Sequence, residues 1–271
     1  MKSTRWLSGA LAVSPSYVRN SLKAIELSVN DCSHYLSALI RAFNAAEPIF
    51  VHPDYEKFFW TCATTAPGWV QTVVLQSAIS ESDGAGLLYR TWQAITYNRE
   101  VEDGLLAHAK DEAYHSRIFL QLVRNVFPGY MTAGQASEIR STLCQIKEAE
   151  IKKSGLHLPE EIAIDYLVQI NLAEVRTLMN LHLFAPILWT LAPLDRKDGV
   201  EKQLRSLQRD ELRHISYTGR LMEAWAANGD AKLVSDLFAR NMSEFNTYTV
   251  LGTKKAIEEY GQGKFPSLLE L

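Results

Sequence analysis

The same five-residue pattern, Asp-Glu-x-x-His, occurs twice in this sequence. The first copy contains Glu112 and His115, and the second contains Glu211 and His214. Residues three apart in a helix lie on one face, about one turn from each other. The glutamate and the histidine of each copy can therefore reach one cation or a close pair of cations. The two copies predict a metal site whose ligands come from two helices.

Each copy stands in the middle of an apolar stripe with helical spacing. The two stripes are Leu105, His108, Glu112, His115, Phe119 and Leu122, and Leu204, Leu207, Glu211, His214, Thr218 and Leu221. Both are apolar at their ends and carry carboxylate and imidazole groups at the centre. A buried ion without a partner costs several kcal/mol of desolvation, so these groups need something that neutralises them. A metal ion does that.

Two upstream glutamates complete the expected ligand set. Glu81 precedes Glu112 by 31 residues, and Glu174 precedes Glu211 by 37 residues. Each spacing allows one helix up, a short turn and a second helix back, so that both members of a pair come level. Glu100 is the alternative to Glu81, but it would have to lie on the loop or on the same helix as Glu112. The sequence thus predicts two helical hairpins, each with half of a two-metal site.

Four carboxylates and two imidazoles form a donor set that suits iron, with manganese as the alternative. The aspartate that precedes each glutamate points away from the ligand face. We expect Asp111 and Asp210 to accept the N–H of a ligand imidazole and so to fix its ring and tautomer. The alternative is an exposed acid on the side of a helix.

Helix-length segments with apolar residues at three- and four-residue steps account for most of the chain. The sequence predicts an all-α protein with one domain over residues 1–271 and a four-helix bundle over about 67–227. The expected bundle helices span about 67–97, 101–126, 159–190 and 199–227, with a connecting helix after the second. A further helix is expected from Ser16 to Ala46. Pro186 is expected to kink or end the third bundle helix.

With its repeated Glu and Asp-Glu-x-x-His pattern, the chain resembles ferritin-like di-iron oxygenases, and most closely the p-aminobenzoate N-oxygenase family. The resemblance covers about residues 70–225. It implies a ferritin-like bundle with two iron ions. It also implies a di-iron monooxygenase that uses O2 to oxidise an amine, an arylamine or an amino acid, to the hydroxylamine, nitroso or nitro level. The electrons would come from an external donor such as a ferredoxin or a reductase.

One ligand of that family is missing from its usual place. The family carries a further histidine one turn before the glutamate of the second copy, where this chain has Leu207. His108 occupies the equivalent place in the first copy, and pseudosymmetry makes it a possible seventh ligand. Alternatively, His108 is a core histidine bonded to a carbonyl group or water, or it faces the substrate.

The sequence indicates substrate contacts less clearly than metal ligands. Asn171, Ala78 and Ala85 are candidates for a substrate pocket, because they lie close to Glu174 or Glu81 on the same stripes. Arg176 and Arg213 could attract a substrate carboxylate, but their helical phases favour the outer face. Oxidation of carbon by a hydroxylase or desaturase, and iron binding by a non-enzymatic ferritin-like protein, remain alternatives to N-oxygenation.

The composition narrows the other possibilities. A net charge of −3 and a pI near 6.2 over 271 residues give no reason to expect nucleic acid as a partner. No segment reaches the ~20 apolar residues that span a bilayer, so no membrane association is expected. Three widely spaced cysteines suit free thiols in the cytoplasm. Surplus apolar surface over residues 16–46 makes a homodimer plausible.

Overall fold

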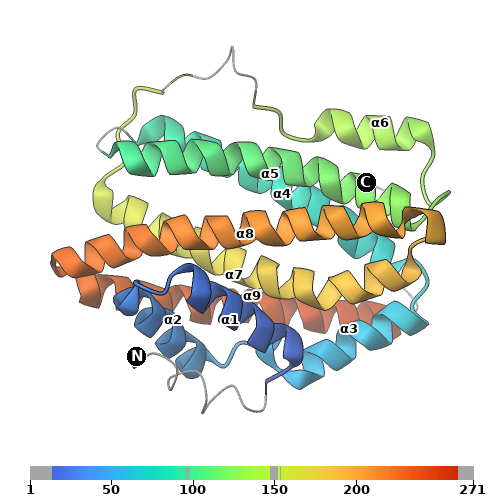
Figure 1. Cartoon of the computed structure of the whole chain (residues 1–271), viewed down its shortest axis with the longest axis horizontal. Coiled ribbons are helices and arrows are strands. Elements are labelled where there is room, and N and C mark those ends of the chain that lie inside the picture. The colour runs from blue at the N-terminus through green and yellow to red at the C-terminus, as the bar shows by residue number, and fades with distance from the viewer. Residues whose placement is uncertain (1–13, 96–97, 147–151, 153, 262–271) are drawn as a thin grey trace. The chain divides into compact units, whose positions relative to one another are not determined.

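The computed structural model describes residues 14–95, 98–146, 152 and 154–261, and within them all regular structure is helical. The α-helices are α1 (Ser16–Ser28), α2 (Ser33–Ala46), α3 (Pro53–Thr65), α4 (Trp69–Ala94), α5 (Arg99–Val126), α6 (Ala133–Thr142), α7 (Glu160–Leu191), α8 (Lys197–Trp225) and α9 (Ala231–Gly261). Short 3-10 turns at Ile49–Val51 and Leu194–Arg196 and a π turn at Ala226–Asp230 separate some of them. The all-α prediction is confirmed, and Figure 1 shows the course of the helices. Among the described residues, no helix combines the length and the apolar character needed to cross a membrane.

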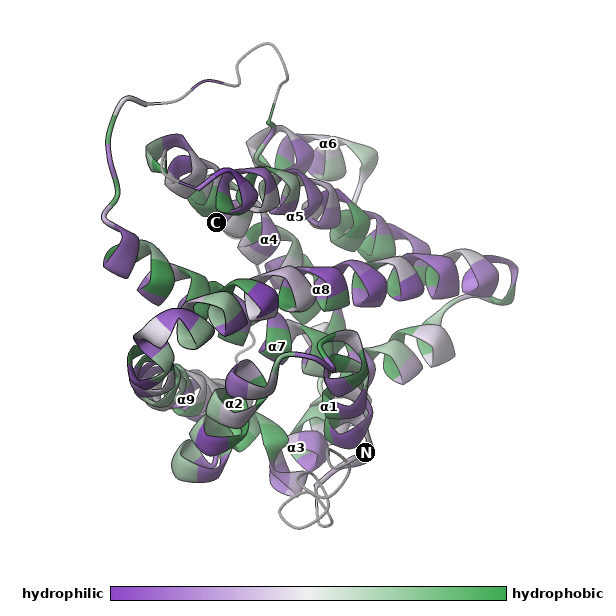
Figure 2. Cartoon of the chain, turned by 60° about the vertical axis from the view of Figure 1, so that its left-hand side comes forward, coloured by the Kyte–Doolittle hydropathy of each residue, from purple (hydrophilic) through white to green (hydrophobic). Residues whose placement is uncertain are grey.

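The four helices expected around the ligands are present as α4, α5, α7 and α8, with ends within a few residues of those predicted. The connecting helix is α6. It begins with a capping box in which Thr132 and Gln135 satisfy each other's backbone N–H groups. Figure 2 shows hydrophilic and hydrophobic residues on different sides of α5 and α8, as their sequence stripes indicate.

One expectation about helix ends is wrong. The segment 16–46 forms two helices rather than one, because α1 ends at Ser28 and α2 begins at Ser33. The polar residues Asn30 and Asp31 lie in the break, and both favour turns over helix interiors. Pro186 was expected to kink or end the third bundle helix: it does not end α7, which continues to Leu191, and the kink stays a prediction. The buried side chains of Ile187 and Leu188 hold this last part of the helix in place.

The chain divides into two compact units, and the division falls inside α7 and α8. The first unit comprises the described parts of Met1–Ala66, Ile164–Phe184 and Glu211–Lys264. The second comprises those of Pro67–Ala163 together with Ala185–Asp210. The expectation of one domain stays a prediction.

In the second unit, α4 and α5 lie side by side along their length (Figure 1). The start of α5 is fixed by Asn98, whose side chain accepts hydrogen bonds from the backbone N–H groups of Glu100 and Val101. The acids Glu100 and Glu102 lie in the first turn, where the helix dipole favours negative charge. These features set the register in which α5 presents its glutamate and histidines to α4.

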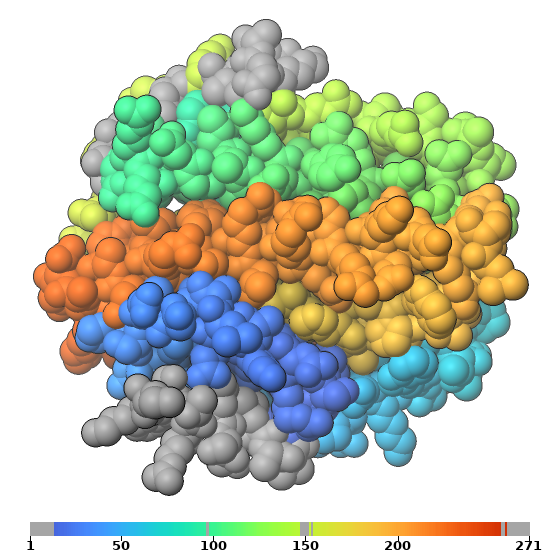
Figure 3. Space-filling model, viewed as in Figure 1, coloured from blue at the N-terminus to red at the C-terminus, as the bar shows by residue number. Residues whose placement is uncertain are grey.

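In the first unit, α2 packs along α9 and is anchored to the last part of α8. The carboxylate of Glu223 in α8 accepts hydrogen bonds from the backbone N–H groups of His34 and Tyr35, at 2.7 and 2.9 Å. Gly219 lets the two helices approach, because a Cβ atom there would lie 3.0 Å from the Tyr35 ring. Figure 3 shows α1 and α2 against this part of α8.

A polar contact between α7 and α9 makes the stability of the first unit depend on pH. The carboxylate of Asp165 accepts a hydrogen bond from Asn241 Nδ2 at 2.9 Å and pairs with Arg240 Nη2 at 2.7 Å. Partial burial acts to raise the pKa of Asp165, but its hydrogen bonds to Asn241, Gln169 and Arg240 outweigh that effect, and the pKa is lowered from 3.8.

A lowered pKa in the folded state means that the Asp165 carboxylate contributes stability above its ordinary pKa. That contribution is lost as the pH falls through the lower, folded-state value. Asp165→Asn should therefore lower the free energy of unfolding at pH 7 and make its decline below pH 4 shallower. Denaturant melts across pH test this, with the exposed Asp236→Asn as control. Equal acid sensitivity of Asp165→Asn and the wild type would contradict the assignment.

Candidate metal centre

A buried triad of possible metal ligands lies in the second unit, between α4 and α5. Glu81 comes from α4, and Glu112 and His115 come from α5. The Nδ1 atom of His115 lies 3.3 Å from Glu112 Oε1 and 3.7 Å from Glu81 Oε2. All three side chains are buried, and His115 is closed to solvent. The sequence prediction that Glu81 joins the first copy of the pattern agrees with this placement.

An equivalent triad lies in the first unit. Glu174 comes from α7, and Glu211 and His214 come from α8. The Nδ1 atom of His214 lies 3.8 Å from Glu211 Oε2 and 3.9 Å from Glu174 Oε2. These side chains are also buried. In both triads, therefore, the histidine turns the same ring nitrogen toward the glutamate three residues earlier and toward a glutamate of the neighbouring helix.

The distances in both triads suit ligands that share an ion. A direct N–H···O hydrogen bond spans about 2.7–3.2 Å, and the four separations above are longer. Two donor atoms about 2.1 Å from a common cation lie roughly 3.0–3.8 Å apart for ordinary bond angles. Three of the four separations fall within this range, and the fourth, 3.9 Å between His214 Nδ1 and Glu174 Oε2, lies just above it.

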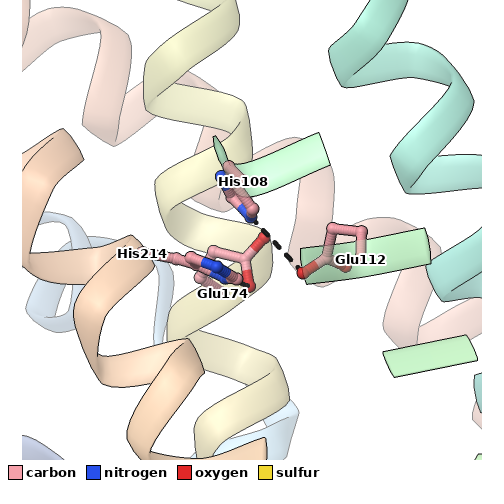
Figure 4. A group of neighbouring side chains, drawn as sticks. All are labelled: His108, Glu112, Glu174 and His214. Atoms are coloured by element: carbon pink, nitrogen blue, oxygen red, sulfur yellow. Dashed lines mark ion pairs between the residues drawn. The ribbon is translucent and has the colours of Figure 1, made fainter. Parts of the chain in front are cut away.

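All seven ligands expected from the sequence belong to buried groups of histidine and glutamate that can hold a metal ion. They are Glu81, His108, Glu112, His115, Glu174, Glu211 and His214. Figure 4 draws four of them, with His108 and Glu112 of α5 joined as one pair and Glu174 and His214 joined as another.

His108 lies beside a triad carboxylate. Its Nε2 atom is 3.5 Å from Glu112 Oε1, and its side chain is almost fully buried. The same carboxylate oxygen lies 3.3 Å from His115 Nδ1, so two imidazoles flank it. This position is compatible with His108 as an additional ligand.

The two aspartates of the pattern have different surroundings. The Oδ2 atom of Asp210 lies 3.6 Å from His115 Nε2, which is longer than a hydrogen bond but beside the ring nitrogen that faces away from the triad. Asp210 also neighbours Ser206 and Arg209 on its own helix. The aspartate of the second copy thus accompanies the histidine of the first copy. Asp111 is half-buried, and its expected contact with an imidazole stays a prediction.

Chemistry and room at the first triad fit a cation. Two buried carboxylates and one buried imidazole converge there. Among the described residues, Glu81 Oε2 accepts no hydrogen bond. Gly84 lies one turn beyond Glu81, and a Cβ atom there would lie 3.7 Å from Glu112 Oε2. Oxygen and imidazole nitrogen donors without thiolates suit iron or manganese. The triads can hold metal ions.

The side chain of Asn171 takes part in a hydrogen-bond network that the sequence did not predict. It accepts a hydrogen bond from Tyr35 Oη at 3.1 Å and donates to Thr218 Oγ1 at 2.8 Å and to the Ile215 carbonyl oxygen at 3.3 Å. Thr218 in turn donates to the His214 carbonyl oxygen at 2.7 Å. The network joins the helix turn before Glu174 to the turn after His214.

The remaining pocket candidates are placed as follows. Ala78 and Ala85 are fully buried on α4, where their small side chains allow close packing, and a role in substrate binding stays a prediction. Arg213 lies on the outer face of α8, as its helical phase predicts. For Arg176 that expectation is wrong, because its guanidinium group stacks on the Phe245 ring of α9 at 4.3 Å. The second side of α7 is covered by other helices of the first unit, which periodicity alone does not reveal.

Comparison with protein-family models, curated proteins and solved structures found no match for this chain.

The Asn171 network should support metal binding by the second triad. Tyr35→Phe removes the donor to Asn171 Oδ1 and leaves a buried acceptor unsatisfied, which we expect to cost about 1–3 kcal/mol of the free energy of unfolding. Because outer contacts hold ligands in place, metal affinity should fall by about tenfold. Denaturant melts and metal titration measure both effects, with the exposed Tyr248→Phe as the matched control. Loss of stability with unchanged metal affinity would limit the network to a folding role.

Proposed function

We propose that this chain is a ferritin-like di-iron monooxygenase that uses O2 to oxygenate the nitrogen of a small amine. The observation that carries the proposal is the repeated triad, in which two histidines present the same nitrogen atom to the same two kinds of glutamate. A pair of equivalent, buried carboxylate–imidazole triads is the ligand arrangement of di-iron four-helix proteins. The helices of the proposed bundle are α4, α5, α7 and α8.

Both triads are proposed to serve one centre. Asp210 and Glu211 are consecutive residues of α8. Asp210 flanks His115 of the first triad, and Glu211 flanks His214 of the second. Two ions held in this way share their charge among four carboxylates.

When bound, the iron ions supply the activation of O2. The residues of the chain supply the rest. The buried carboxylates would hold the ions, and Asp210 faces Nε2 of His115, which would leave Nδ1 to bind metal. One oxygen atom goes to the amine nitrogen, and the other leaves as water. The step to the hydroxylamine consumes two electrons and two protons, which an external ferredoxin or reductase provides.

The proposal that the enzyme oxidises nitrogen rather than carbon rests on the resemblance to the p-aminobenzoate N-oxygenase family. The second candidate, a non-enzymatic ferritin-like iron-binding protein, would use the same ligands, because buried carboxylates and imidazoles also bind iron without turnover. The experiments below separate these functions.

Anaerobic titration with Fe(II), followed by calorimetry and by elemental analysis after desalting, should show two iron ions per chain. Binding only to the folded state should also raise the melting temperature. Glu112→Gln and Glu211→Gln should each lower the stoichiometry or weaken binding by about 10–100-fold. The matched control is Glu201→Gln, which removes an exposed carboxylate. Uptake of one ion or none by the wild type would contradict the di-iron centre.

The reaction itself is tested by supplying the Fe(II)-loaded chain with 18O2, a chemical or enzymatic reductant and a panel of arylamines and amino acids. Mass spectrometry should find one labelled oxygen atom on the amine nitrogen, and Glu112→Gln should abolish the product. A product that is hydroxylated or desaturated at carbon would contradict N-oxygenation and would support the alternative of a hydroxylase or desaturase. Oxygen uptake that stops when the bound iron is oxidised would favour the iron-binding protein.

His108 is proposed as the seventh ligand. His108→Leu introduces the residue that stands in the equivalent place of the second copy, at Leu207. We expect it to weaken binding of one of the two iron ions by about 10–100-fold, in line with loss of one ligand contact. Unchanged iron stoichiometry and affinity in His108→Leu would identify a core histidine instead.

A further inference from the structure

Cationic side chains gather on the solvent side of α5 and of the first part of α8, both in the second unit. The two helices are neighbours there, because Asn125 Nδ2 donates to Gln203 Oε1 at 3.1 Å and Arg196 Nη1 donates to the Arg124 carbonyl oxygen at 3.0 Å. Figure 3 shows them next to each other on the side turned toward the viewer. We call this surface the α5–α8 face, and its exposed cations are Arg117, Arg124, Lys202, Arg205 and Arg209.

The charge of the α5–α8 face is opposite in sign to that of the chain as a whole. Over residues 110–126 and 197–209, the exposed and half-buried side chains include seven cations and three acids, which are Asp111, Asp198 and Glu201. The chain has a net charge of −3. Glu201 pairs with Arg205 Nη2 at 2.6 Å, and the cations still outnumber the acids. Such a local excess of positive charge steers negatively charged partners toward the face.

An exposed aromatic side chain lies on the same face. Tyr114 of α5 is 54% exposed, and the guanidinium carbon of Arg117 lies 6.0 Å from the centre of its ring. Tyrosine and arginine are enriched in protein–protein interfaces. The acids interleaved with the cations disfavour the continuous row of phosphates that a nucleic acid presents. The composition of the α5–α8 face therefore favours an acidic protein as its partner.

The α5–α8 face lies close to a candidate metal ligand. Arg209 Nε is 3.4 Å from Asp210 Oδ1, and Asp210 Oδ2 is 3.6 Å from His115 Nε2. The side chain of Arg209 is 74% exposed, whereas His115 is closed to solvent. A single carboxylate thus stands between an exposed arginine and the imidazole whose other nitrogen faces Glu112 and Glu81.

From this arrangement, we propose that the α5–α8 face is the docking site of a small acidic protein that carries one electron at a time, such as a ferredoxin. The proposal rests on the proposed oxygenase, because a metal centre that is reduced in each turnover needs such a partner. In one encounter the carrier is oxidised and an iron ion is reduced from the ferric to the ferrous state. Two encounters supply the two electrons of one hydroxylation of nitrogen.

Proximity and charge together select this face. Electron transfer between proteins slows steeply with distance, so a carrier has to dock beside the metal ligands. At the α5–α8 face, one layer of side chains separates Arg209 from His115. The same face carries the excess of cations that complements an acidic carrier.

Binding is tested without turnover, by calorimetry of the full chain with an oxidised [2Fe–2S] ferredoxin of low pI. The chain is used with oxidised iron bound and again without metal. The ferredoxin should bind at low ionic strength, and its affinity should fall as the salt concentration rises. Cytochrome c, a basic one-electron carrier, should not bind. A DNA duplex is the probe for the other class of acidic partner and should bind more weakly than the ferredoxin.

Arg124→Glu combined with Lys202→Glu reverses two exposed charges of the α5–α8 face. This variant should bind the ferredoxin about tenfold more weakly at low ionic strength and should show a smaller dependence on salt. Arg41→Glu combined with Lys57→Glu makes the same change of net charge at exposed positions of α2 and α3 in the first unit, and it is the matched control. It should bind the ferredoxin as the wild type does. Thermal melts verify that both variants fold.

Wild-type binding that does not respond to salt, or that is unchanged by the double reversal on the α5–α8 face, would overturn the proposal. Tighter binding of the duplex than of the ferredoxin would also overturn it and would assign the face to nucleic acid.

A second readout distinguishes failure of the docking site from failure of the oxygenase. The iron-loaded, oxidised chain is mixed anaerobically with reduced ferredoxin or with dithionite, and the rate of iron reduction is measured. Reduction and product formation with dithionite, together with a ferredoxin that neither binds nor reduces the iron, would remove the docking site and leave the oxygenase. A chain that takes up no iron would overturn both, even where the ferredoxin binds.

Discussion

The cost of placing charge in the protein interior is the constraint on which this structure depends. Both triads put carboxylates and imidazoles at the centre of apolar helix stripes, where desolvation opposes ionisation. Cations between the donors remove that cost, and the spacing of the donors leaves the distances that such cations require. The apolar ends of the stripes on α5 and α8 supply the packing that keeps these polar centres closed to water. A metal bound by these residues would therefore couple its binding to folding.

The two triads are alike down to the atoms that face one another, but the residues that surround them differ. Around the first triad, His108 adds a nitrogen donor and Asp210 stands behind His115. Around the second, hydrogen bonds from Tyr35 through Asn171 to Thr218 hold the neighbouring helix turns. Two ions bound by these triads would have equivalent primary ligands and unequal surroundings.

The sequence pointed to the candidate ligands because their chemistry conflicts with their position. A glutamate on an apolar stripe is by itself a sign of a functional site. Helix geometry alone was enough to interpret the sequence spacing between Glu81 or Glu174 and the repeated pattern. The supporting network was not visible, because Tyr35 and Asn171 are 136 residues apart and nothing local links them. The break between α1 and α2 and the course of α7 past Pro186 depended on tertiary packing, which outweighs local propensity.

Arg176 shows the limit of periodicity most clearly. The helical phase of Arg176 places it outside the stripe that contains Glu174. In a helix covered on one side only, a residue at such a position is exposed to solvent. In the first unit, however, Phe59 of α3 packs against Phe184 of α7, and Phe245 of α9 stacks on Arg176 itself. A helix enclosed in this way can carry acids on one face and a partly buried cation on another. By covering the second side of α7, α3 and α9 limit the exposure of an arginine that the pattern of α7 alone would place in solvent.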